Sequence, residues 1–412
     1  MDGGPTASPT QLQFNPFLPE FIENPYPLYH RLRAEDPVHQ SPMGFWVLTR
    51  YDDVVTVLRD QRFGRKGFEP LLSALFGSGN EQSGFVTSML FRDPPDHTRL
   101  RALVSKAFTP RVIERLRLRI QEIADELLDR ARDAGAMDVV ADLAYPLPVI
   151  VICEMLGVPA SDRDTFKQWS LDIGRSLDAI GMQATGMLTD PEVVVRGNAA
   201  RRALTAYFRN GLIPERRQRP RADLLSALIA AEEEGDKLTE GELLATCNLL
   251  FVAGHETTVN LIGNGLLALL RHPAQLSALR QDPSLIQSAV EELLRYDGPV
   301  QRTGRIPHVD VEIDGKKIAQ GEMVVALIGA ANRDPARFPD PDRLDITRAD
   351  NDHIAFGAGI HFCLGASLAR LEAQIAINAL IRRIPGLTLA TTAPEWRETS
   401  VLRGLKALPV AF

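Results

Sequence analysis

Residues 356–365 read Phe-Gly-Ala-Gly-Ile-His-Phe-Cys-Leu-Gly, and good helix formers follow from Ala366 to Ala373. Gly357 and Gly359 allow backbone conformations that other residues resist, and they allow a flat ligand to come close to the main chain. Cys363 then stands just before a predicted helix N-terminus, where unpaired N–H groups and the helix dipole favour an anion. The pattern predicts a lowered thiol pKa. A lone thiolate among glycines suits one axial bond to a large planar metal cofactor.

This segment resembles the haem-binding signature of the cytochrome P450 haem-thiolate monooxygenases. The match covers seven positions within 14 residues, namely Phe356, Gly357, Gly359, His361, Cys363, Gly365 and Ala369. The resemblance implies a soluble bacterial-type member in which Cys363 is the axial ligand of the iron of haem b. It assigns to cofactor binding Phe356, Gly357, His361, Cys363 and Gly365. It also implies the triangular cytochrome P450 fold, mainly α with minor β, enclosing one haem b.

A second motif, at residues 251–258, reads Phe-Val-Ala-Gly-His-Glu-Thr-Thr within a predicted helix. By i, i+3 and i+4 spacing, one face of this helix carries Leu250, Ala253, Thr257 and Leu261. Thr257 or Thr258 can donate its hydroxyl to a carbonyl one turn earlier and bend the helix, which leaves a groove beside an alcohol and an acid. The motif resembles the family's small-Gly-x-acid-Thr-Thr sequence. The resemblance implies that Glu256 and Thr257 supply the protons for dioxygen activation, with Ala253 against the haem.

Two further groups of residues match the family by position. Glu292 and Arg295 are spaced i, i+3 on one helical face. In the family, such a pair forms a buried network with an arginine from a later proline-rich loop. Residues 338–343, Phe-Pro-Asp-Pro-Asp-Arg, match that loop, so Arg343 is the expected third member. We expect this network to serve folding and haem retention.

The two propionates of haem require cationic partners. Residues at the positions where bacterial relatives hold propionates are His97, Arg101, Arg305 and His361. His97 and Arg101 share one face of a predicted helix by i, i+4 spacing. Arginine also recognises carboxylates through its planar guanidinium. We expect these four residues to clamp the propionates.

Composition excludes several classes of protein. The 412 residues carry 46 Lys and Arg against 53 Asp and Glu, a net charge of −7, which disfavours a nucleic-acid partner. Three widely spaced cysteines make a disulfide scaffold or a zinc site improbable and fit the reducing cytoplasm. The N-terminus lacks the pattern of a signal peptide, and each apolar stretch is too short or too interrupted by polar residues to span a membrane. We expect a cytoplasmic monomer with no membrane anchor.

The pattern of hydrophobic residues predicts mainly helices. Helical periodicity covers about 25–33, 111–134, 160–175, 192–212, 221–233, 239–271, 273–280, 283–296 and 365–383. Strands are expected in a hairpin over 38–48, around 309–313 before the turn pair Asp314-Gly315, and in the C-terminal stretch. No linker, repeat or reductase motif is present. We expect an irregular segment over 1–20 and one haem-thiolate monooxygenase domain over 21–412, without a fused reductase.

The expected activity is insertion of one oxygen atom of O₂ into a hydrophobic organic substrate, by C–H hydroxylation or epoxidation. Electrons would come from a ferredoxin with its reductase, or from a flavodoxin. A peroxide-driven peroxygenase and a non-catalytic haem sensor remain as alternatives; neither would need the Glu256–Thr257 pair. A basic patch at Arg99, Lys106, Arg111 and Arg115 is either a docking site for the electron donor or a solvated charged face.

The substrate itself is not predictable from these motifs. Expected pocket walls, mostly apolar as in other ligand pockets, are Val86, Met89, Leu90, Leu250, Val300, Gln301 and Leu402. The segment 168–190, which includes Leu171, is a further candidate wall. Arg302 faces either this pocket or the solvent. Fatty acids, terpenoids, steroids, macrolides and drug-like compounds all remain possible substrates.

Overall fold

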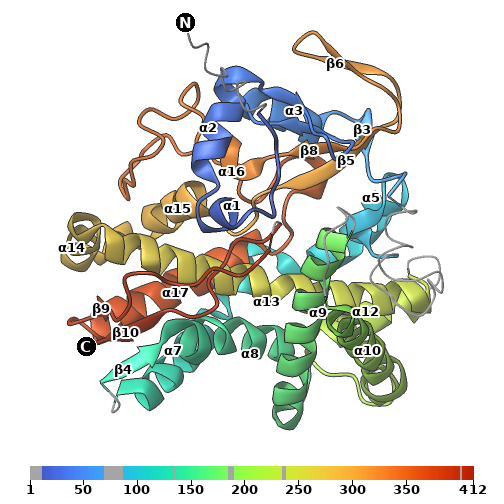
Figure 1. Ribbon diagram of the computed structural model, residues 1–412. Helices are drawn as coiled ribbons and strands as arrows, with labels where there is room; N and C mark the ends of the chain where they lie inside the picture. The colour runs from blue at the N-terminus through green and yellow to red at the C-terminus, as the bar shows by residue number, and fades with distance from the viewer. Residues whose placement is uncertain (1–11, 69–86, 133–134, 184–189, 234–237, 400) are drawn as a thin grey trace, which may run out of the picture.

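The computed structural model describes residues 12–68, 87–132, 135–183, 190–233, 238–399 and 401–412. Helices make up most of the molecule, and a small β-rich region lies at one end (Figure 1). One long helix, α13 (Glu240–Arg271), crosses the centre between the β-rich region and a group of helices on its other side. The expectation of a mainly α chain with minor β is confirmed.

Most predicted helices are present, with two changes of detail. The helices before α13 are α1 Pro19–Glu23, α2 Tyr26–Glu35, α3 Tyr51–Arg59, α5 Asp96–Ser105, α6 Pro110–Glu114, α7 Arg117–Arg132, α8 Pro146–Met155, α9 Arg163–Gln183, α10 Pro191–Tyr207, α11 Ile213–Gln218 and α12 Leu224–Glu233. After α13 come α14 Pro273–Gln281, α15 Ile286–Asp297, α16 Ile328–Ala331 and α17 Ala366–Arg383. The helix predicted over 111–134 is two helices, α6 and α7. The helix predicted over 192–212 ends in a π-helical turn, Phe208–Leu212.

The largest sheet has five strands in the order β1-β2-β8-β5-β3. These strands are β1 Val38–Gln40, β2 Trp46–Leu48, β3 Phe63–Gly64, β5 Thr303–Pro307 and β8 Val324–Ala326. β1 and β2 form the predicted antiparallel hairpin, with Val38 opposite Leu48, and β8 runs parallel to β2. The sheet therefore joins the N-terminal part of the chain to the segment after α15.

Two small sheets complete the β structure. β6 (Val311–Ile313) and β7 (Lys316–Ile318) form a hairpin whose turn residues Asp314 and Gly315 have φ of 51° and 73°. Left-handed conformations at both turn positions are what the predicted Asp-Gly turn requires. β4 (Ala136–Asp138), β10 (Pro409–Ala411) and β9 (Thr388–Leu389) form the third sheet, which contains the predicted C-terminal strands.

α13 is the central element of the hydrophobic core. It begins with a capping box, in which Thr239 and Glu242 each accept a hydrogen bond from the other's backbone N–H. Most of its residues are buried on every side, as expected for a helix surrounded by other elements. It packs against α8, α15 and α17. Since α17 also follows the Cys363 loop directly, the two predicted motifs lie on helices that are in contact.

The N-terminal segment is packed against the β-rich region. Residues 1–11 lie outside the described residues, and 12–18 contain no helix or strand. The Phe14 ring is nevertheless buried, with edge-to-face contacts to Phe21 and Phe45 at centroid distances of 5.7 and 6.3 Å. Helix α1 was not predicted, and its first two residues lie in the segment 1–20 that was expected to be irregular.

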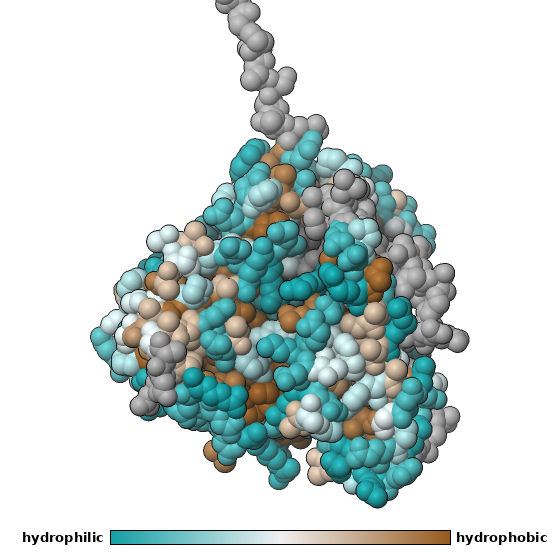
Figure 2. All heavy atoms as spheres, turned by 60° about the horizontal axis from the view of Figure 1, so that its bottom comes forward, coloured by the Kyte–Doolittle hydropathy of each residue, from teal (hydrophilic) through white to brown (hydrophobic). Residues whose placement is uncertain are grey.

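Within the described residues, none of the helices combines the length and the apolar character needed to cross a bilayer. The face seen in Figure 2 is mostly hydrophilic, and hydrophobic residues on it occur in scattered groups.

Candidate active site

The Cys363 loop is a tight, closed turn. Gly357 and Gly359 have φ of 75° and 70°, in the left-handed region that favours glycine. The Cys363 N–H donates to the Phe356 carbonyl at 2.9 Å and closes the loop. A Cβ added to Gly359 would lie 2.3 Å from the Leu58 carbonyl of α3, so the loop backbone packs directly on that helix. α17 then starts at Ala366, which confirms that Cys363 precedes a helix N-terminus.

The predicted lowering of the Cys363 thiol pKa is wrong for the chain alone. Burial raises the pKa of this thiol, and the Gly365 N–H and the charges of Arg101 and Arg370 only partly offset that effect. Apolar surroundings thus outweigh the helix terminus. A coordinated metal deprotonates a thiol outright, so metal binding at Cys363 would oppose this effect of burial.

On α13, the geometry around Thr257 is as predicted. The Thr257 hydroxyl donates to the Ala253 carbonyl at 3.2 Å, one turn earlier. Ala253 is exposed and Thr257 half-buried, whereas Phe251 and His255 on the same turns are buried. A small residue and a hydroxyl therefore border open space in the middle of an otherwise buried helix. This is the surface that a flat cofactor would cover.

Glu256 is buried beside this surface and has one ionic partner. Its Oε1 accepts a hydrogen bond from Arg397 Nη1 at 3.1 Å. Burial raises the pKa of Glu256, and Arg397 opposes that effect. Arg397 is itself fixed, because its backbone N–H donates to the Gly404 carbonyl at 2.9 Å and its Nε to the Leu405 carbonyl at 3.2 Å. Sequence reasoning missed Arg397, which lies 141 residues from Glu256 and matches no local motif.

The predicted propionate ligands lie in one cationic cluster. The rings of His97 and His361 are 4.3 Å apart between centroids. Burial and the nearby charges of Arg65, Arg305, His97 and Arg101 lower the pKa of His361 to about 2. Arg65, which the sequence analysis missed, completes the cluster. It follows strand β3 and shares the Thr303 hydroxyl with Arg305, each at 3.2 Å.

This cluster has buried polar atoms without partners. Both ring nitrogens of His97, Nε2 of His361 and Nε of Arg65 make no hydrogen bond. Burial and the charge of Arg305 lower the pKa of Arg65 to about 9, and burial lowers that of Arg305 to about 10. Such a concentration of buried cations and unsatisfied donors calls for an anionic ligand. Two carboxylates on a cofactor held by Cys363 fit it.

The predicted ion network exists with a different third arginine. Glu292 and Arg295 are fully buried, with Arg295 Nε 2.8 Å from Glu292 Oε2. Arg348 Nε completes the network at 3.1 Å from Glu292. The prediction of Arg343 is wrong because its side chain is 65 % exposed and reaches only Asp345, while its backbone carbonyl accepts from Arg295. The sequence located the loop correctly, but the path of the loop brings Arg348, and not Arg343, to the Glu292 carboxylate.

A second ion pair supports the Cys363 loop from α15. Glu291 binds Arg370 of α17 through two hydrogen bonds of 2.7 Å, and His353 at 3.1 Å. The Arg370 guanidinium lies 4.5 Å from the Phe356 ring centroid, a cation–π contact. Phe356 is thereby held beneath the loop that it closes.

The predicted pocket walls are only partly brought together. Val86 lies outside the described residues. Met89 and Leu250 are buried in the main hydrophobic core and Leu90 packs against it, while Val300 pairs with Leu402 in an isolated β-bridge. The prediction for Gln301 is wrong because its amide is used structurally. Tyr29 donates to its Oε1 at 3.2 Å, and its Nε2 donates to the Gly298 carbonyl at 2.8 Å.

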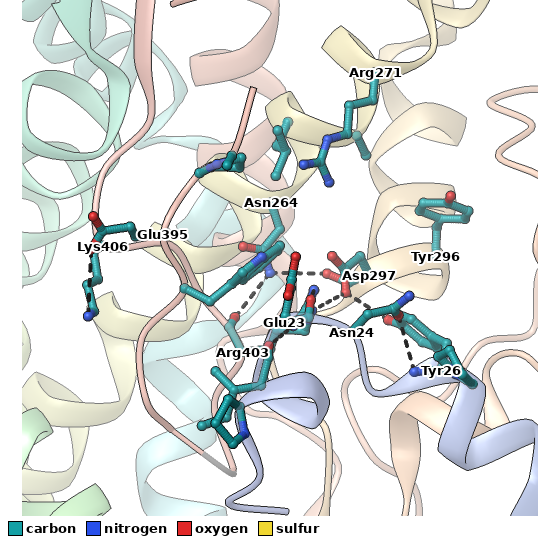
Figure 3. A pocket seen from close by; sticks show the side chains of 18 of the residues that line it. Glu23, Asn24, Tyr26, Asn264, Arg271, Tyr296, Asp297, Glu395, Arg403 and Lys406 are labelled. Atoms are coloured by element: carbon teal, nitrogen blue, oxygen red, sulfur yellow. Dashed lines mark hydrogen bonds and ion pairs between the residues drawn. The ribbon is translucent and has the colours of Figure 1, made fainter. Parts of the chain in front are cut away.

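A surface cavity of about 1120 Å³ lies elsewhere, between α1, the C-terminal half of α13, the end of α15 and the C-terminal segment (Figure 3). None of the predicted site residues lines it. Its floor is a structural junction. Asp297 accepts from Tyr26 Oη at 2.7 Å and from Arg403 Nε at 2.8 Å, and Asn264 Nδ2 donates to the Arg403 carbonyl at 3.0 Å.

Comparison with known proteins agrees with this geometry. The sequence profile described as "Cytochrome P450" matches residues 37–395. The chain is 44 % identical to cytochrome P450 monooxygenase PikC of Streptomyces venezuelae, over 99 % of this chain and 96 % of that protein. It is 45 % identical to a vitamin D(3) 25-hydroxylase of Pseudonocardia autotrophica, over 97 % and 96 %.

Solved structures show the same fold. The structure of CalO2 is similar with a TM-score of 0.91 and 39 % identity, covering 97 % of this chain and 99 % of that one. The structure of P450BioI in complex with a fatty-acyl carrier protein has a TM-score of 0.86 and 43 % identity, covering 95 % and 99 %. The Cys363 loop, the Glu256–Thr257 helix, the fold and these near-complete matches lead to one conclusion: the chain belongs to the cytochrome P450 family of haem-iron oxidoreductases.

Proposed function

We propose that this cytochrome P450 is an O₂-dependent monooxygenase that inserts one oxygen atom into a hydrophobic organic substrate, by C–H hydroxylation or epoxidation. Separate proteins supply the electrons, a ferredoxin with its reductase or a flavodoxin. The observation that carries the proposal is a buried acid, Glu256, directly followed by the Thr257 hydroxyl, where the middle of α13 leaves Ala253 exposed. A proton donor at this place serves a reaction that consumes protons.

Haem b is the cofactor that the residues fit. Cys363 would hold the iron, and the cluster of Arg65, His97, Arg101, Arg305 and His361 would hold the propionates. When bound, haem supplies the redox chemistry, and electron donation from the thiolate favours cleavage of the O–O bond. The protein supplies position, exclusion of water and protons.

The proton supply is the part that this chain's own residues perform. Burial keeps a proton on Glu256 more firmly than on an exposed carboxyl. Arg397, whose side chain is 20 % exposed, links the Glu256 carboxyl to the surface. The Thr257 hydroxyl donates to Ala253, so its oxygen is free to accept a proton and pass it on. We infer a path from solvent past Arg397 to Glu256 and then to Thr257 Oγ1.

The relatives support a large hydrophobic substrate. They include a 6-deoxyerythronolide B hydroxylase at 42 % identity and the vitamin D(3) 25-hydroxylase. A structure at 46 % identity holds myristic acid, and one at 37 % holds testosterone. We propose a substrate of this class, a long or polycyclic molecule with few polar groups. The mainly apolar residues Met89, Leu90 and Leu250 agree with it.

One experiment separates monooxygenase, peroxygenase and sensor. The holoenzyme is supplied with O₂, a ferredoxin and its reductase, or with hydrogen peroxide alone, and product from myristic acid and testosterone is measured together with oxygen consumption. We expect reductant-dependent oxygen consumption that falls by about 10²-fold in Glu256→Gln. Peroxide-driven turnover that is unaffected by Glu256→Gln would favour a peroxygenase. Absence of oxygen consumption with any electron donor would favour a sensor.

A further inference from the structure

The carboxyl of Glu256 lies directly against the backbone of α9. A Cβ added to Gly174 of α9 would be 2.9 Å from Glu256 Oε2 and 3.0 Å from Oε1. Cβ atoms essentially never come within 3.0 Å of another atom, so a side chain at position 174 would force the carboxyl of Glu256 to shift away from the place where Arg397 binds it. The carboxyl of Glu256 therefore occupies the space that a side chain at position 174 would fill.

One turn earlier, α9 is tied to the residue before the acid. The Ser170 hydroxyl is hydrogen-bonded to His255 Nε2, and His255 Nδ1 lies 2.6 Å from the Phe251 carbonyl. Because a carbonyl can only accept, Nδ1 carries the proton and Nε2 accepts from Ser170. Burial and the charge of Arg397 lower the pKa of His255 to about 4, so the ring is neutral at neutral pH and this pattern persists.

The two contacts act on neighbouring residues from one face of α9. Ser170 and Gly174 are four residues apart and share that face, and they contact His255 and Glu256 in turn. Ser170 is 4 % exposed and His255 2 % exposed, so neither exchanges its partner for water. On the remaining side, Arg397 binds Glu256 at 3.1 Å. The carboxyl is thus confined between the α9 backbone and one guanidinium.

We propose that α9 positions the catalytic acid: Gly174 provides the space that an acid of glutamate length requires, and the Ser170–His255 hydrogen bond fixes α9 at that distance from α13. The inference rests on the proposed function, since it assigns positioning roles toward Glu256. Gly174, Ser170 and His255 are positioning residues and do not touch the reacting atoms. An aspartate at 256, one methylene shorter, would not need the space at Gly174.

The test enlarges the side chain at position 174 and then shortens the acid at position 256. Gly174→Ala adds the methyl that would collide with Glu256, and Gly174→Ala combined with Glu256→Asp shortens the acid to make room for it. Gly211→Ala is the matched control, because Gly211 is exposed in the π turn and a Cβ there has no atom within 4 Å. Oxygen consumption by the holoenzyme with ferredoxin and reductase is measured in H₂O and D₂O, without added substrate and with myristic acid.

We expect Gly174→Ala to slow oxygen consumption by about tenfold and to increase the solvent isotope effect, since a small misplacement of a catalytic group is costly. Gly211→Ala should match the wild type. The double variant should be faster than Gly174→Ala alone. Ser170→Ala, which releases α9 without adding bulk, should raise the solvent isotope effect as well. Equal rates for Gly174→Ala and Gly211→Ala would overturn the proposal.

Thermal unfolding of the same holoenzymes gives a readout that does not depend on turnover. Alanine is the better helix former, so Gly211→Ala should leave the midpoint unchanged or raise it. Gly174→Ala should lower the midpoint, and adding Glu256→Asp to it should raise the midpoint again. The double variant should therefore unfold at a higher temperature than the summed effects of the two single changes predict. Additive midpoints would contradict the contact. If Glu256→Gln leaves oxygen consumption unchanged, the proposed function fails instead, and the unfolding cycle still decides whether α9 positions the side chain.

Discussion

At the scale of single residues, the ion network around Glu292 shows what a buried carboxylate requires. Its oxygens accept from Arg295, from Arg348, from the Asn351 amide at 3.2 Å and from the Asp345 N–H at 2.9 Å. All of these donors bind the carboxylate of Glu292, a residue that is 0 % exposed. Removal of one arginine would leave uncompensated charge in the core.

Arg348→Ala should therefore destabilise the holoenzyme by about 3–5 kcal/mol, the cost of breaking a buried ion pair. Arg343→Ala removes only an exposed contact and should stay within about 0.5 kcal/mol of the wild type. Chemical denaturation of both variants measures the difference. A larger loss for Arg343→Ala than for Arg348→Ala would restore the assignment made from the sequence.

The pair at Glu291 predicts a dependence of stability on pH. Burial alone would raise the pKa of Glu291, but the hydrogen bonds from His353 and Arg370 lower it from 4.5 to about 2. A carboxyl whose pKa is lower in the folded state stabilises the protein above its unfolded pKa, and this contribution is lost as pH falls toward the folded pKa. The stability advantage of the wild type over Glu291→Gln should thus be constant above about pH 5 and shrink between pH 4.5 and 2.

Denaturation of the wild type and Glu291→Gln across that range gives the measurement, with Glu154→Gln as a control. Glu154 is also paired and its pKa is lowered, but its partners Arg119 and Arg163 belong to α7 and α9 and not to the Cys363 loop or α17. Only Glu291→Gln should weaken retention of haem. A difference in stability that stays constant down to pH 2 would contradict the lowered pKa of Glu291.

Among the site residues, those in local motifs could be predicted and those brought in by the fold could not. Cys363, Glu256 and the Glu292–Arg295 pair stand in short patterns that resemble motifs of the family, and this resemblance assigned their roles. Arg65 follows a two-residue strand, and Arg397 is positioned by its backbone pairing with Gly404. Neither has a periodic or spacing signal, because each reaches the site only through long-range packing.

At the scale of elements, the loop between α16 and α17 depends on its contact with α3. Gly359 combines a left-handed φ with a close approach to the Leu58 carbonyl. A side chain at position 359 would both strain the left-handed backbone and collide with the Leu58 carbonyl. Gly315, in the β6–β7 turn, has a similar φ of 73° and nothing within 4 Å of its Cβ position.

Gly359→Ala should lower stability well beyond the cost of φ strain and should weaken haem retention, because the Cys363 loop would have to leave α3. Gly315→Ala should show the conformational cost alone, on the order of 1–3 kcal/mol. Haem content after purification and the unfolding midpoint measure the two effects. Equal losses for the two variants would mean that the contact with α3 does not hold the loop.

The elements themselves were predicted unevenly. α13 and α17 were placed within one or two residues, because both are long and strongly apolar. The break between α6 and α7 was missed, since the apolar spacing continues through Arg115 and Leu116 although the helix does not. The pairing of β2 with β8 was also unpredictable, because a parallel pair between residues 46 and 324 leaves no local pattern.

At the scale of the whole molecule, cofactor and fold stabilise each other. Five cationic or protonatable groups, Arg65, His97, Arg101, Arg305 and His361, come from four separate segments of the chain. Burial and, after it, the neighbouring positive charges lower the pKa values of Arg65 and His361. The propionates would neutralise these charges and join the segments.

Removal of haem should therefore lower the unfolding midpoint and make it sensitive to salt. Added chloride or phosphate should stabilise the apoprotein more than the holoenzyme, because ions screen the uncompensated cations. Unfolding midpoints at low and high ionic strength, with and without haem, test this expectation. If the unfolding midpoints of the apoprotein and the holoenzyme depended equally on salt, the propionates would not bind at this cluster.

The central claim is that Cys363 is the axial ligand of a haem in this fold. The most direct measurement is the absorption spectrum of the ferrous–CO complex of the wild type and of Cys363→Ala, with Cys153→Ala as the buried-thiol control. We predict a thiolate-type red-shifted Soret band for the wild type and Cys153→Ala, and its loss in Cys363→Ala. A red-shifted band that survives in Cys363→Ala would contradict the assignment of the ligand.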